Sequence, residues 1–343
     1  MTFVRNAWYV ACWAADLGAA PLACIIVDEP VVLYRGAGGR PVALEDRCCH
    51  RSLPLSLGRV EGAHIRCGYH GLLFDPDGRC VEVPGQSTVP PGAVVRAFPT
   101  VERWGAVWLW PGDAAKADPA AIPNVFWLDD PGWTPAPGYL RVAADYRLLV
   151  DNLLDLTHVS YLHRSTLAGD DVEAVTPVTT RREADRIVVG RWMRNVSPPP
   201  LYTKASGITG TVDRWQWITW EPPANVYFDI GCARSGTGAP EGDRSQGVSM
   251  WSTHLITPET ATSCHYHFSF ARDYRLGDPA VTAILRDGAR SAFMEDLVVL
   301  ETQQRMQATH CDAPTVDINI DNAPLQSRRI LDALVGQEQA AAE

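Results

Sequence analysis

The chain has 343 residues, a hydrophobic fraction of 46% and a formal net charge of −10 at pH 7. This length fits one large domain or two modest ones, and the hydrophobic fraction can bury a sizeable core, which excludes a disordered chain. The acidic balance, with no run of Lys or Arg, argues against a nucleic-acid surface because phosphate binding needs a basic face.

Neither the start of the chain nor any later stretch indicates a membrane or secreted protein. The segment MTFVRNAWYVACWAADL lacks the charged region, long apolar region and cleavage site of a signal peptide. No stretch approaches the roughly eighteen consecutive apolar residues of a membrane span. The nine cysteines are an odd number spread along the chain, which does not indicate a disulfide framework. We therefore expect a cytoplasmic protein with reduced thiols.

Short apolar runs separated by turn residues predict that the first 110 residues are rich in β-strands. Ala23–Val27, Val31–Tyr34 and Val42–Glu45 alternate with turn signals, and Ala106–Trp110 is a strongly apolar last strand. The following segment is rich in Pro, Ala, Gly and Asp, which forbids long regular structure. We place the domain boundary there, with a first domain at 1–112, a connection at 113–138 and a second domain at 139–343.

Two short pairs of metal ligands lie in the loops of the first domain. Cys48 and His50 are two residues apart, Cys67 and His70 are three apart, and sixteen residues separate the pairs. Zinc sites usually keep their cysteines together and their histidines together. A Rieske [2Fe–2S] cluster instead binds two cysteines on one iron and two histidines on the other. One Cys and one His from each loop therefore favour a Rieske cluster, with zinc as the alternative.

A second group of polar residues lies in a segment that is predicted to be helical from Tyr146 to about His163. Asn152, Asp155 and His158 follow one another at helical spacing, on an otherwise leucine-rich helix where they are costly to bury without partners. His158 and His163 are five residues apart, about 140° around a straight helix. Both can bind one ion only if the helix loosens or ends between them.

Two histidines require a carboxylate to complete the 2-His-1-carboxylate arrangement of non-haem iron(II). A second long helix is predicted from Pro279 to about Gln307, with Asp278 as its cap. It carries Glu295 and Asp296 inside an apolar stretch, and spacing alone does not choose between them. A solvated pair of helix charges is the alternative.

From Val172 to about Ala271 alternating residues predict strands, and the tail from Gln337 is predicted to be frayed. Within the strands, His254 is a candidate donor to a substrate anion or else a buried core histidine. We expect His265 and His267 to pack rather than to bind metal. Three tryptophans are expected either in the core or along a pocket: Trp215, Trp217 and Trp220.

Taken together, the two ligand groups resemble the oxygenase component of Rieske non-haem iron oxygenases over nearly the whole chain. The family's C-x-H and C-x-x-H motif matches the cluster loops, and its D-x-x-H-x-x-x-x-H motif begins at Asp155. Its distal aspartate matches Asp296 better than Glu295. The most similar groups are the vanillate and dicamba O-demethylases and the toluenesulfonate methyl-monooxygenases. The matching ligands are Cys48, His50, Cys67 and His70 for the cluster, and His158, His163 and Asp296 for the iron.

The resemblance implies an α+β chain in which an all-β Rieske domain precedes a START-like helix-grip catalytic domain with an antiparallel sheet and long helices. It also implies a homotrimer served by a separate NADH-dependent flavin/iron–sulfur reductase. The expected reaction is O2-dependent hydroxylation of a methyl or methoxy carbon of a small anionic aromatic, with formaldehyde released from a methoxy group. Hydroxylation of a methyl group, N-demethylation, ring dihydroxylation and a zinc-stapled binding module remain alternatives.

Within this family pattern Asp155 is expected to bridge His70 of one chain and His158 of the next, and Asn152 to orient oxygen or substrate. His254 looks like the carboxylate-binding histidine of the dicamba enzyme. Phe228 and Gly288 stand where that enzyme has a polar partner and a stacking tryptophan, so its own substrate is not expected here.

Overall fold

The computed structural model describes residues 3–164, 166–168, 175–239, 241 and 243–341, and its backbone contacts divide the chain into two compact units. The first unit comprises Met1–Pro123 with Thr257–Ala261, and the second comprises Asn124–Ile256 with Thr262–Glu343. The division after Pro123 lies inside the Pro-rich segment 113–138.

The first unit contains three small sheets, with strand orders β1-β11-β10, β2-β3-β4-β9 and β5-β6-β7-β8. The expected all-β domain is confirmed, since apolar runs such as Ala106–Leu109 form fully buried strands. The strands are β1 (Tyr9–Trp13), β2 (Leu22–Ile26), β3 (Glu29–Arg35), β4 (Pro41–Glu45), β5 (Arg59–Glu61), β6 (His64–Arg66), β7 (Leu73–Phe74), β8 (Cys80–Glu82), β9 (Ala97–Phe98), β10 (Thr100–Arg103) and β11 (Ala106–Leu109).

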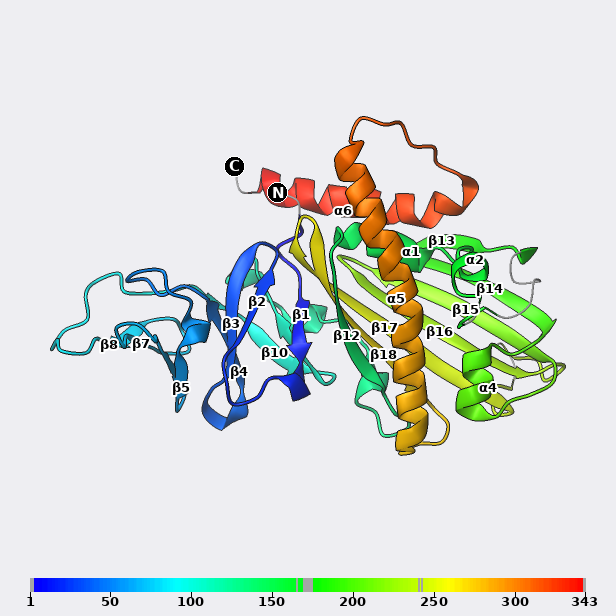
Figure 1. Cartoon of the computed structure of the whole chain (residues 1–343), viewed down its shortest axis with the longest axis horizontal. Coiled ribbons are helices and arrows are strands. Elements are labelled where there is room, and N and C mark those ends of the chain that lie inside the picture. The colour runs from blue at the N-terminus through cyan, green and yellow to red at the C-terminus, as the bar shows by residue number, and fades with distance from the viewer. Residues whose placement is uncertain (1–2, 165, 169–174, 240, 242, 342–343) are drawn as a thin grey trace. The chain divides into compact units, whose positions relative to one another are not determined.

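The second unit is built on a seven-stranded sheet in the order β12-β18-β17-β16-β15-β14-β13 (Figure 1). Its strands after β12 follow one another in sequence order across the sheet, as expected for hairpin connections. The strands are β12 (Pro137–Val142), β13 (Thr179–Glu183), β14 (Arg186–Val196), β15 (Val212–Glu221), β16 (Asn225–Arg234), β17 (Gly247–Thr260) and β18 (Ser263–Arg272).

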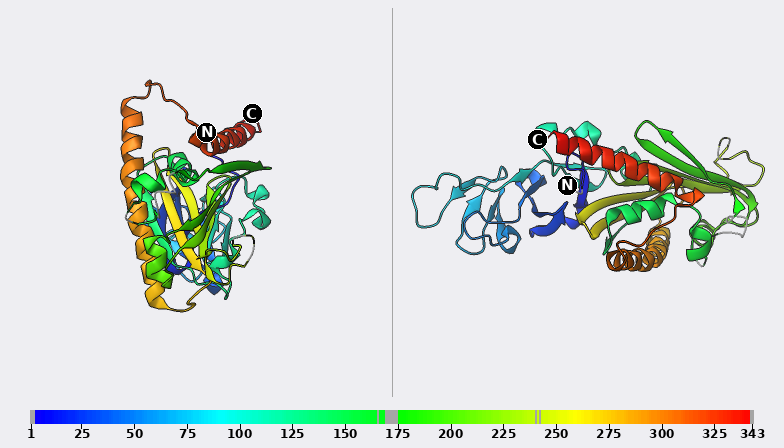
Figure 2. Two further views of the ribbon diagram at one scale, coloured as in Figure 1. Left: turned by 90° about the vertical axis from the view of Figure 1, so that its right-hand side faces the viewer. Right: turned by 90° about the horizontal axis from the view of Figure 1, so that it is seen from above.

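One long helix, α5 (Pro279–Thr309), runs along one face of this sheet (Figure 2). The Asp278 carboxylate caps it by accepting hydrogen bonds from the backbone N–H groups of Ala280 and Val281, as its sequence predicts. Two short helices, α1 (Tyr146–Leu154) and α2 (Val159–Leu162), and a third, α4 (Pro200–Ser206), complete the arrangement around the site. No helix among the described residues is long and apolar enough to cross a membrane.

The prediction of one helix from Tyr146 to His163 is wrong in one respect. α1 ends at Leu154, and Asp155 adopts an extended backbone with φ −100° and ψ 108° before α2 begins. The carboxylate of Asp155 accepts a 2.7 Å hydrogen bond from the N–H of Thr157, so the residue uses its side chain to leave the helix. This break is the condition under which His158 and His163 can turn toward one ion.

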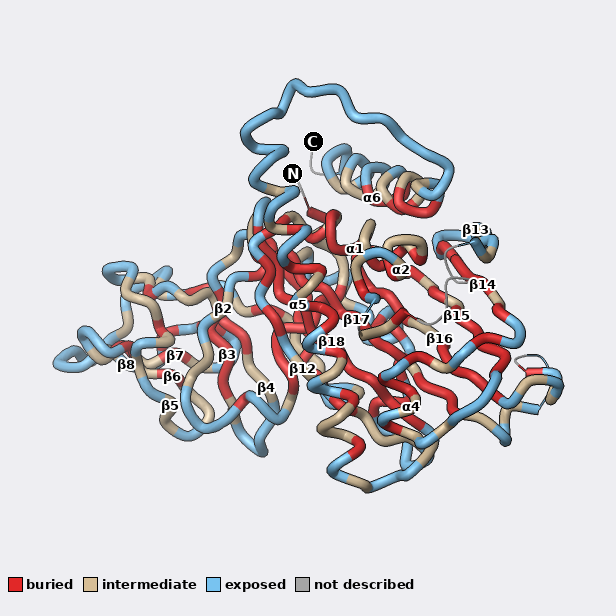
Figure 3. Tube along the Cα trace, turned by 45° about the vertical axis from the view of Figure 1, so that its right-hand side comes forward, coloured by how far each residue is buried: buried red, intermediate tan, exposed pale blue. Residues whose placement is uncertain are grey.

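Two further helices were not predicted. α4 interrupts the strand-rich region, and α6 (Asn322–Ala340) occupies the carboxyl end, so the expected fraying from Gln337 is wrong up to Ala340. α6 follows an exposed connection after α5 and turns one side, including Ile330 and Leu331, into the core (Figure 3). The start of the predicted strand region at Val172 lies outside the described residues.

Candidate metal centres and substrate cavity

The two cluster loops of the first unit have the same backbone closure. The Cys48 N–H donates to the Leu53 carbonyl and the Cys67 N–H donates to the Leu72 carbonyl, both at 2.8 Å. In each loop the residue four positions after the cysteine donates its backbone N–H to the cysteine carbonyl. This residue is Ser52 in the first loop and Gly71 in the second. Both of these residues have positive φ, 58° and 76°. The loops are therefore two copies of one tight turn, which presents a Cys and a His from each.

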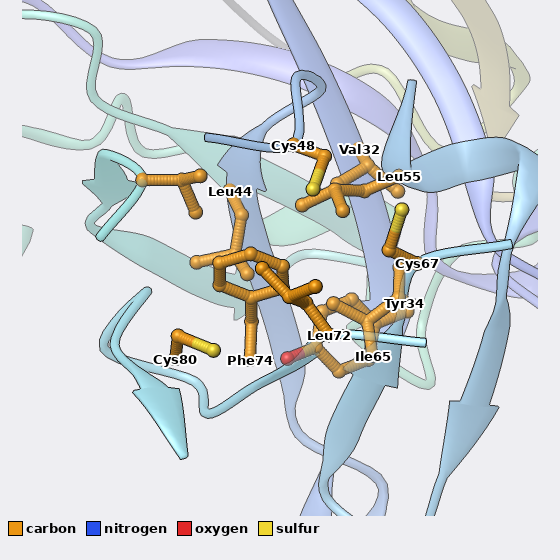
Figure 4. Close-up of a cluster of buried hydrophobic side chains, with 11 residues drawn as sticks. Val32, Tyr34, Leu44, Cys48, Leu55, Ile65, Cys67, Leu72, Phe74 and Cys80 are labelled. Carbon is orange, nitrogen blue, oxygen red and sulfur yellow. The ribbon is translucent and has the colours of Figure 1, made fainter. Parts of the chain in front are cut away.

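The cysteine and histidine ligands of the cluster loops differ in how deeply they are buried. Cys48 and Cys67 are each 2% exposed and lie at one edge of the hydrophobic core drawn in Figure 4. His50 and His70 are exposed, and their ring centroids are 4.6 Å apart. Burial raises the pKa of Cys48 to about 11, so a thiolate there requires a cation beside it. Two buried thiols and two exposed imidazoles fit a [2Fe–2S] cluster with an inner Cys-bound iron and an outer His-bound iron.

In the second unit the structure brings together the three residues expected at the mononuclear iron. One ligand atom each from His158, His163 and Asp296 lies within 4.8 Å of the others. The Asp296 Oδ1 atom is 3.1 Å from His163 Nε2 and 3.6 Å from His158 Nε2. Asp296 is 3% exposed and His163 is 2% exposed. Two imidazoles and one carboxylate converging on one point fit a divalent iron with open positions.

Glu295 has a different role from its neighbour. Its Oε2 atom lies 2.7 Å from His163 Nδ1, on the opposite edge of the ring from Asp296, and also accepts a 3.2 Å hydrogen bond from the Thr166 hydroxyl. Burial lowers the pKa of His163, but the carboxylates of Asp296 and Glu295 outweigh this and raise it. The structure thus places Asp296, not Glu295, between the two histidines.

Asp155 lies behind His158. Its Oδ2 atom is 3.7 Å from His158 Nδ1, which is a buried nitrogen with no hydrogen-bond partner among the described residues. Burial raises the pKa of Asp155, but interactions with His158 and with the backbone N–H and hydroxyl of Thr157 outweigh it and lower the pKa. The carboxylate is therefore ionised at neutral pH and can take up the His158 N–H once that ring is fixed from its other side.

Asn152, one turn before Asp155, faces the same place. Its amide nitrogen donates to Asp296 Oδ1 at 3.1 Å. The segment carrying Asn152 is held from two sides. Gln304 of α5 accepts the N–H of Asp145, the cap of α1, at 2.8 Å, and Arg328 of α6 makes a bidentate ion pair with Asp151. Both neighbouring helices thus fix the ligand-bearing segment.

A cavity opens beside these ligands, between α1, α5 and the strands β15 to β18. Successive side chains of β15 point to opposite faces of the sheet. Arg214 and Gln216 therefore line the cavity, whereas Trp215 and Trp217 pack on the other face. Trp220 is fully buried and is not among the lining residues. The walls are mainly apolar and include Leu153, Leu156, Val159, Phe228, Ile230, Phe270 and Phe293.

His254 also lines the cavity, and both of its ring nitrogens have partners. Its Nε2 atom lies 2.9 Å from the Ser252 hydroxyl and its Nδ1 atom lies 2.6 Å from the Tyr266 hydroxyl. Burial lowers the pKa of His254 to about 3, so the ring is neutral at physiological pH. The ring therefore brings no charge to the cavity. His265 and His267 lie on the opposite face of the sheet, and His265 Nδ1 is 2.9 Å from the Tyr139 hydroxyl.

Tyr202 and Arg214 are two of the cavity residues that the sequence does not single out. Tyr202 is on the unpredicted helix α4, and Arg214 is on a strand whose two faces both carry large residues. Arg214 lies two residues before Gln216, so the two side chains share a face of β15, but the sequence does not tell which face meets the cavity. Gly288 does not line the cavity. A Cβ there would meet Leu201 Cδ1 at 2.5 Å, so this glycine allows α4 to pack closely on α5.

The chain matches two known protein families, one over each part of the chain. The Rieske [2Fe–2S] domain matches residues 7–99, and the vanillate O-demethylase oxygenase C-terminal domain matches residues 142–337. The chain is 43% identical to the toluene-4-sulfonate monooxygenase iron–sulfur subunit of Comamonas testosteroni, covering 98% of both chains. It is 43% identical to a vanillate O-demethylase oxygenase subunit of a Pseudomonas species, covering 92% of this chain and 97% of that one.

Among solved structures, dicamba monooxygenase bound to 3,6-dichlorosalicylic acid superposes with a TM-score of 0.93 at 36% identity, over 99% of this chain and 100% of that chain. The dicamba O-demethylase oxygenase of Stenotrophomonas maltophilia is 40% identical over 90% of each chain. These matches support the Rieske cluster over the zinc alternative. The chain belongs to the Rieske non-haem iron oxygenases with a vanillate O-demethylase-type catalytic domain, and it is the oxygenase component of such a monooxygenase system.

Proposed function

We propose that this oxygenase hydroxylates a methyl or methoxy carbon of a small anionic aromatic compound. The observation that carries the proposal is the apolar cavity that opens directly onto His158, His163 and Asp296. Its phenylalanine walls suit an aromatic ring, and Asn152 and His254 are the neutral polar residues that we assign to substrate contact. Relatives with vanillate, dicamba and toluenesulfonate in their names share 40–43% identity with the chain.

When bound, the [2Fe–2S] cluster would transfer electrons and the mononuclear iron would activate O2. The side chains of Cys48, His50, Cys67 and His70 would hold the cluster, and those of His158, His163 and Asp296 would hold the mononuclear iron. One oxygen atom enters a C–H bond of the substrate, and the other leaves as water after the uptake of two electrons and two protons. A hydroxylated methoxy carbon is a hemiacetal, which breaks into a phenol and formaldehyde.

Asp155 is the positioning residue that we assign to catalysis. Its carboxylate would hold the His158 Nδ1–H, which directs Nε2 of that ring toward the metal. We also propose a homotrimer in which Asp155 accepts a hydrogen bond from His70 of a neighbouring copy. Exposure supports this assignment, since His70 is exposed and the Asp155 side chain retains 23% of its accessible surface. Electrons would come from NADH through a separate flavin/iron–sulfur reductase.

The test is turnover with a surrogate NADH-dependent reductase. We would offer methoxybenzoates, methylbenzoates, toluenesulfonate and N-methyl aromatics, and measure O2 uptake, formaldehyde and hydroxylated products. Formaldehyde in proportion to O2 uptake with methoxybenzoates is the expected result. O2 uptake that yields no oxidised product from any of these compounds would contradict the proposal.

Methyl hydroxylation is the second candidate. It is favoured by the 43% identity to the toluene-4-sulfonate monooxygenase subunit over 98% of both chains. In the same assay, a stable hydroxymethyl product without formaldehyde would assign the enzyme to this reaction.

A further inference from the structure

Arg214 is the one permanently charged cation among the described residues that line the cavity. It lies on β15, is 2% exposed and shares a face of the strand with Gln216. Burying a guanidinium in an apolar cavity is unfavourable unless charged or polar groups compensate for the lost water. Arg214 therefore brings a positive charge into a cavity whose walls are mainly apolar.

Its contacts place the guanidinium next to the iron-ligand segment. Arg214 Nη2 donates to the Leu167 carbonyl at 3.3 Å, and the Leu167 N–H donates to the His163 carbonyl at 3.1 Å. The ring centroid of Tyr202 lies 5.6 Å from the Arg214 Cζ atom. The backbone after His163 and the ring of Tyr202 thus position the cation at the cavity wall.

The sheet register shows that Arg214 and His254 belong to different ends of the cavity. Arg214 pairs with Cys232, which pairs with Val248, and His254 lies six residues beyond Val248 along β17. Six residues of strand correspond to roughly 20 Å between the backbone positions. The His254 end offers a neutral ring whose nitrogens already contact Ser252 and Tyr266.

The other charges of the cavity restrict where an anion can bind. Asp155 and Asp296 are the two carboxylates among its described lining residues. An aromatic acid is repelled by both, although a bound iron offsets the charge of Asp296. Among the described lining side chains Arg214 supplies the opposite charge, and a guanidinium matches a carboxylate or sulfonate with paired N–H donors.

We propose that Arg214 binds the anionic group of the substrate and thereby selects aromatic carboxylates and sulfonates over their neutral analogues. This inference rests on the proposed function, since it names the group that fixes the ring while the methyl or methoxy carbon faces the iron ligands. His254, at the other end of the cavity, then contributes no charge to the binding of the anion.

The experiment compares matched acids and amides. Wild type, Arg214→Met and Arg214→Lys would be assayed with 3-methoxybenzoate and 3-methoxybenzamide, and with toluenesulfonate and toluenesulfonamide. Loss of a charge-assisted hydrogen-bonded pair predicts that Arg214→Met lowers kcat/KM for the acids about 100-fold. For the amides it should change less than threefold, and Arg214→Lys should lie between. Arg194→Met, an exposed arginine stacked on Trp192, is the matched control and should leave the acid-to-amide ratio unchanged.

Equal losses for acid and amide would assign Arg214 a packing role and overturn the proposal, as would an unchanged kcat/KM for the acids. Equilibrium dialysis of benzoate and benzamide on the wild-type holoenzyme gives a second measurement that needs neither a variant nor turnover. The proposal requires tighter binding of benzoate, and equal affinity would overturn it. If benzoate binds through Arg214 but no aromatic is oxidised, the proposed function fails and the anion site stands.

Discussion

The two metal sites differ in how their ligands are distributed along the chain and in how deeply they are buried. All four cluster ligands lie between Cys48 and His70, on two turns with matching backbone hydrogen bonds. The iron ligands come from the broken segment around His158 and from Asp296 on the distant helix α5. The cluster histidines are exposed, whereas His163 and Asp296 are almost completely buried.

This contrast indicates how each site is held in place. Local turns define the cluster site, so its geometry depends on a few backbone hydrogen bonds inside one unit. The iron site depends on the packing of α1, α5 and α6, and on carboxylates that orient the histidines from behind. Substitutions behind the iron site should therefore affect metal binding or turnover while the cluster remains intact.

The largest effect is expected from Asp296→Ala. It removes the carboxylate between the two histidines, so the mononuclear iron should be lost and product formation should fall below about one hundredth of wild type. Iron analysis should show the loss of this iron, with the visible absorbance of the cluster retained. Asp287→Asn, at an exposed position of the same helix, is the control. Retention of the mononuclear iron in Asp296→Ala would contradict the assignment.

Asp155→Asn should separate metal binding from turnover. The amide keeps the size of the side chain but loses the negative charge, so we expect both metals to remain and turnover to fall about 100-fold or more. Single-turnover measurements with the reduced enzyme would follow oxidation of the cluster and product formation together. Normal turnover in this variant would exclude the positioning role of Asp155.

Glu295→Gln should have a smaller effect and act on metal affinity. Glu295 accepts from His163 Nδ1, and loss of such a carboxylate typically weakens metal binding 10–100-fold. Titration of the iron-depleted enzyme with Co²⁺ would measure this affinity without turnover. Thr166→Val, which removes only the second hydrogen bond to Glu295, should weaken binding less. Equal affinities in wild type and Glu295→Gln would show that Glu295 does not support the site.

Arg328→Met should destabilise the second unit modestly, because its ion pair with Asp151 is partly exposed. We expect a loss of about 1 kcal/mol, or about 3 °C in Tm. Burial raises the pKa of Asp151, and Arg328 opposes that rise. Without Arg328 the pKa rises further, so the variant should lose stability as the pH rises through this value and approach wild type at lower pH.

Thermal unfolding at pH 5 and pH 8 would measure this difference, with the exposed Arg329→Met as the control. A destabilisation of Arg328→Met that is greater at pH 5 than at pH 8 would contradict the assigned electrostatics.

Sequence patterns predicted those parts of the site whose residues lie close together in the chain, and did not predict the parts that depend on contacts between distant segments. The spacing from Cys48 to His70 was enough to propose the cluster, and leucine periodicity located the segment with His158. The break at Asp155 was anticipated only as a requirement of ligand geometry, because Tyr146 to His163 contains no Gly or Pro. The helix α6 was missed, and the face of β15 that carries Arg214 could not be chosen because alternation alone does not tell inside from outside.

The contact between Gly288 and Leu201 connects a position outside the cavity to the cavity wall. A Cβ at position 288 would meet Leu201 Cδ1 at 2.5 Å, and the next residue, Tyr202, lines the cavity. A larger residue at position 288 therefore requires the Leu201 side chain to move or to be replaced by a smaller one. Substitutions at position 288 could in this way alter the substrate range indirectly, through the helix that carries Tyr202.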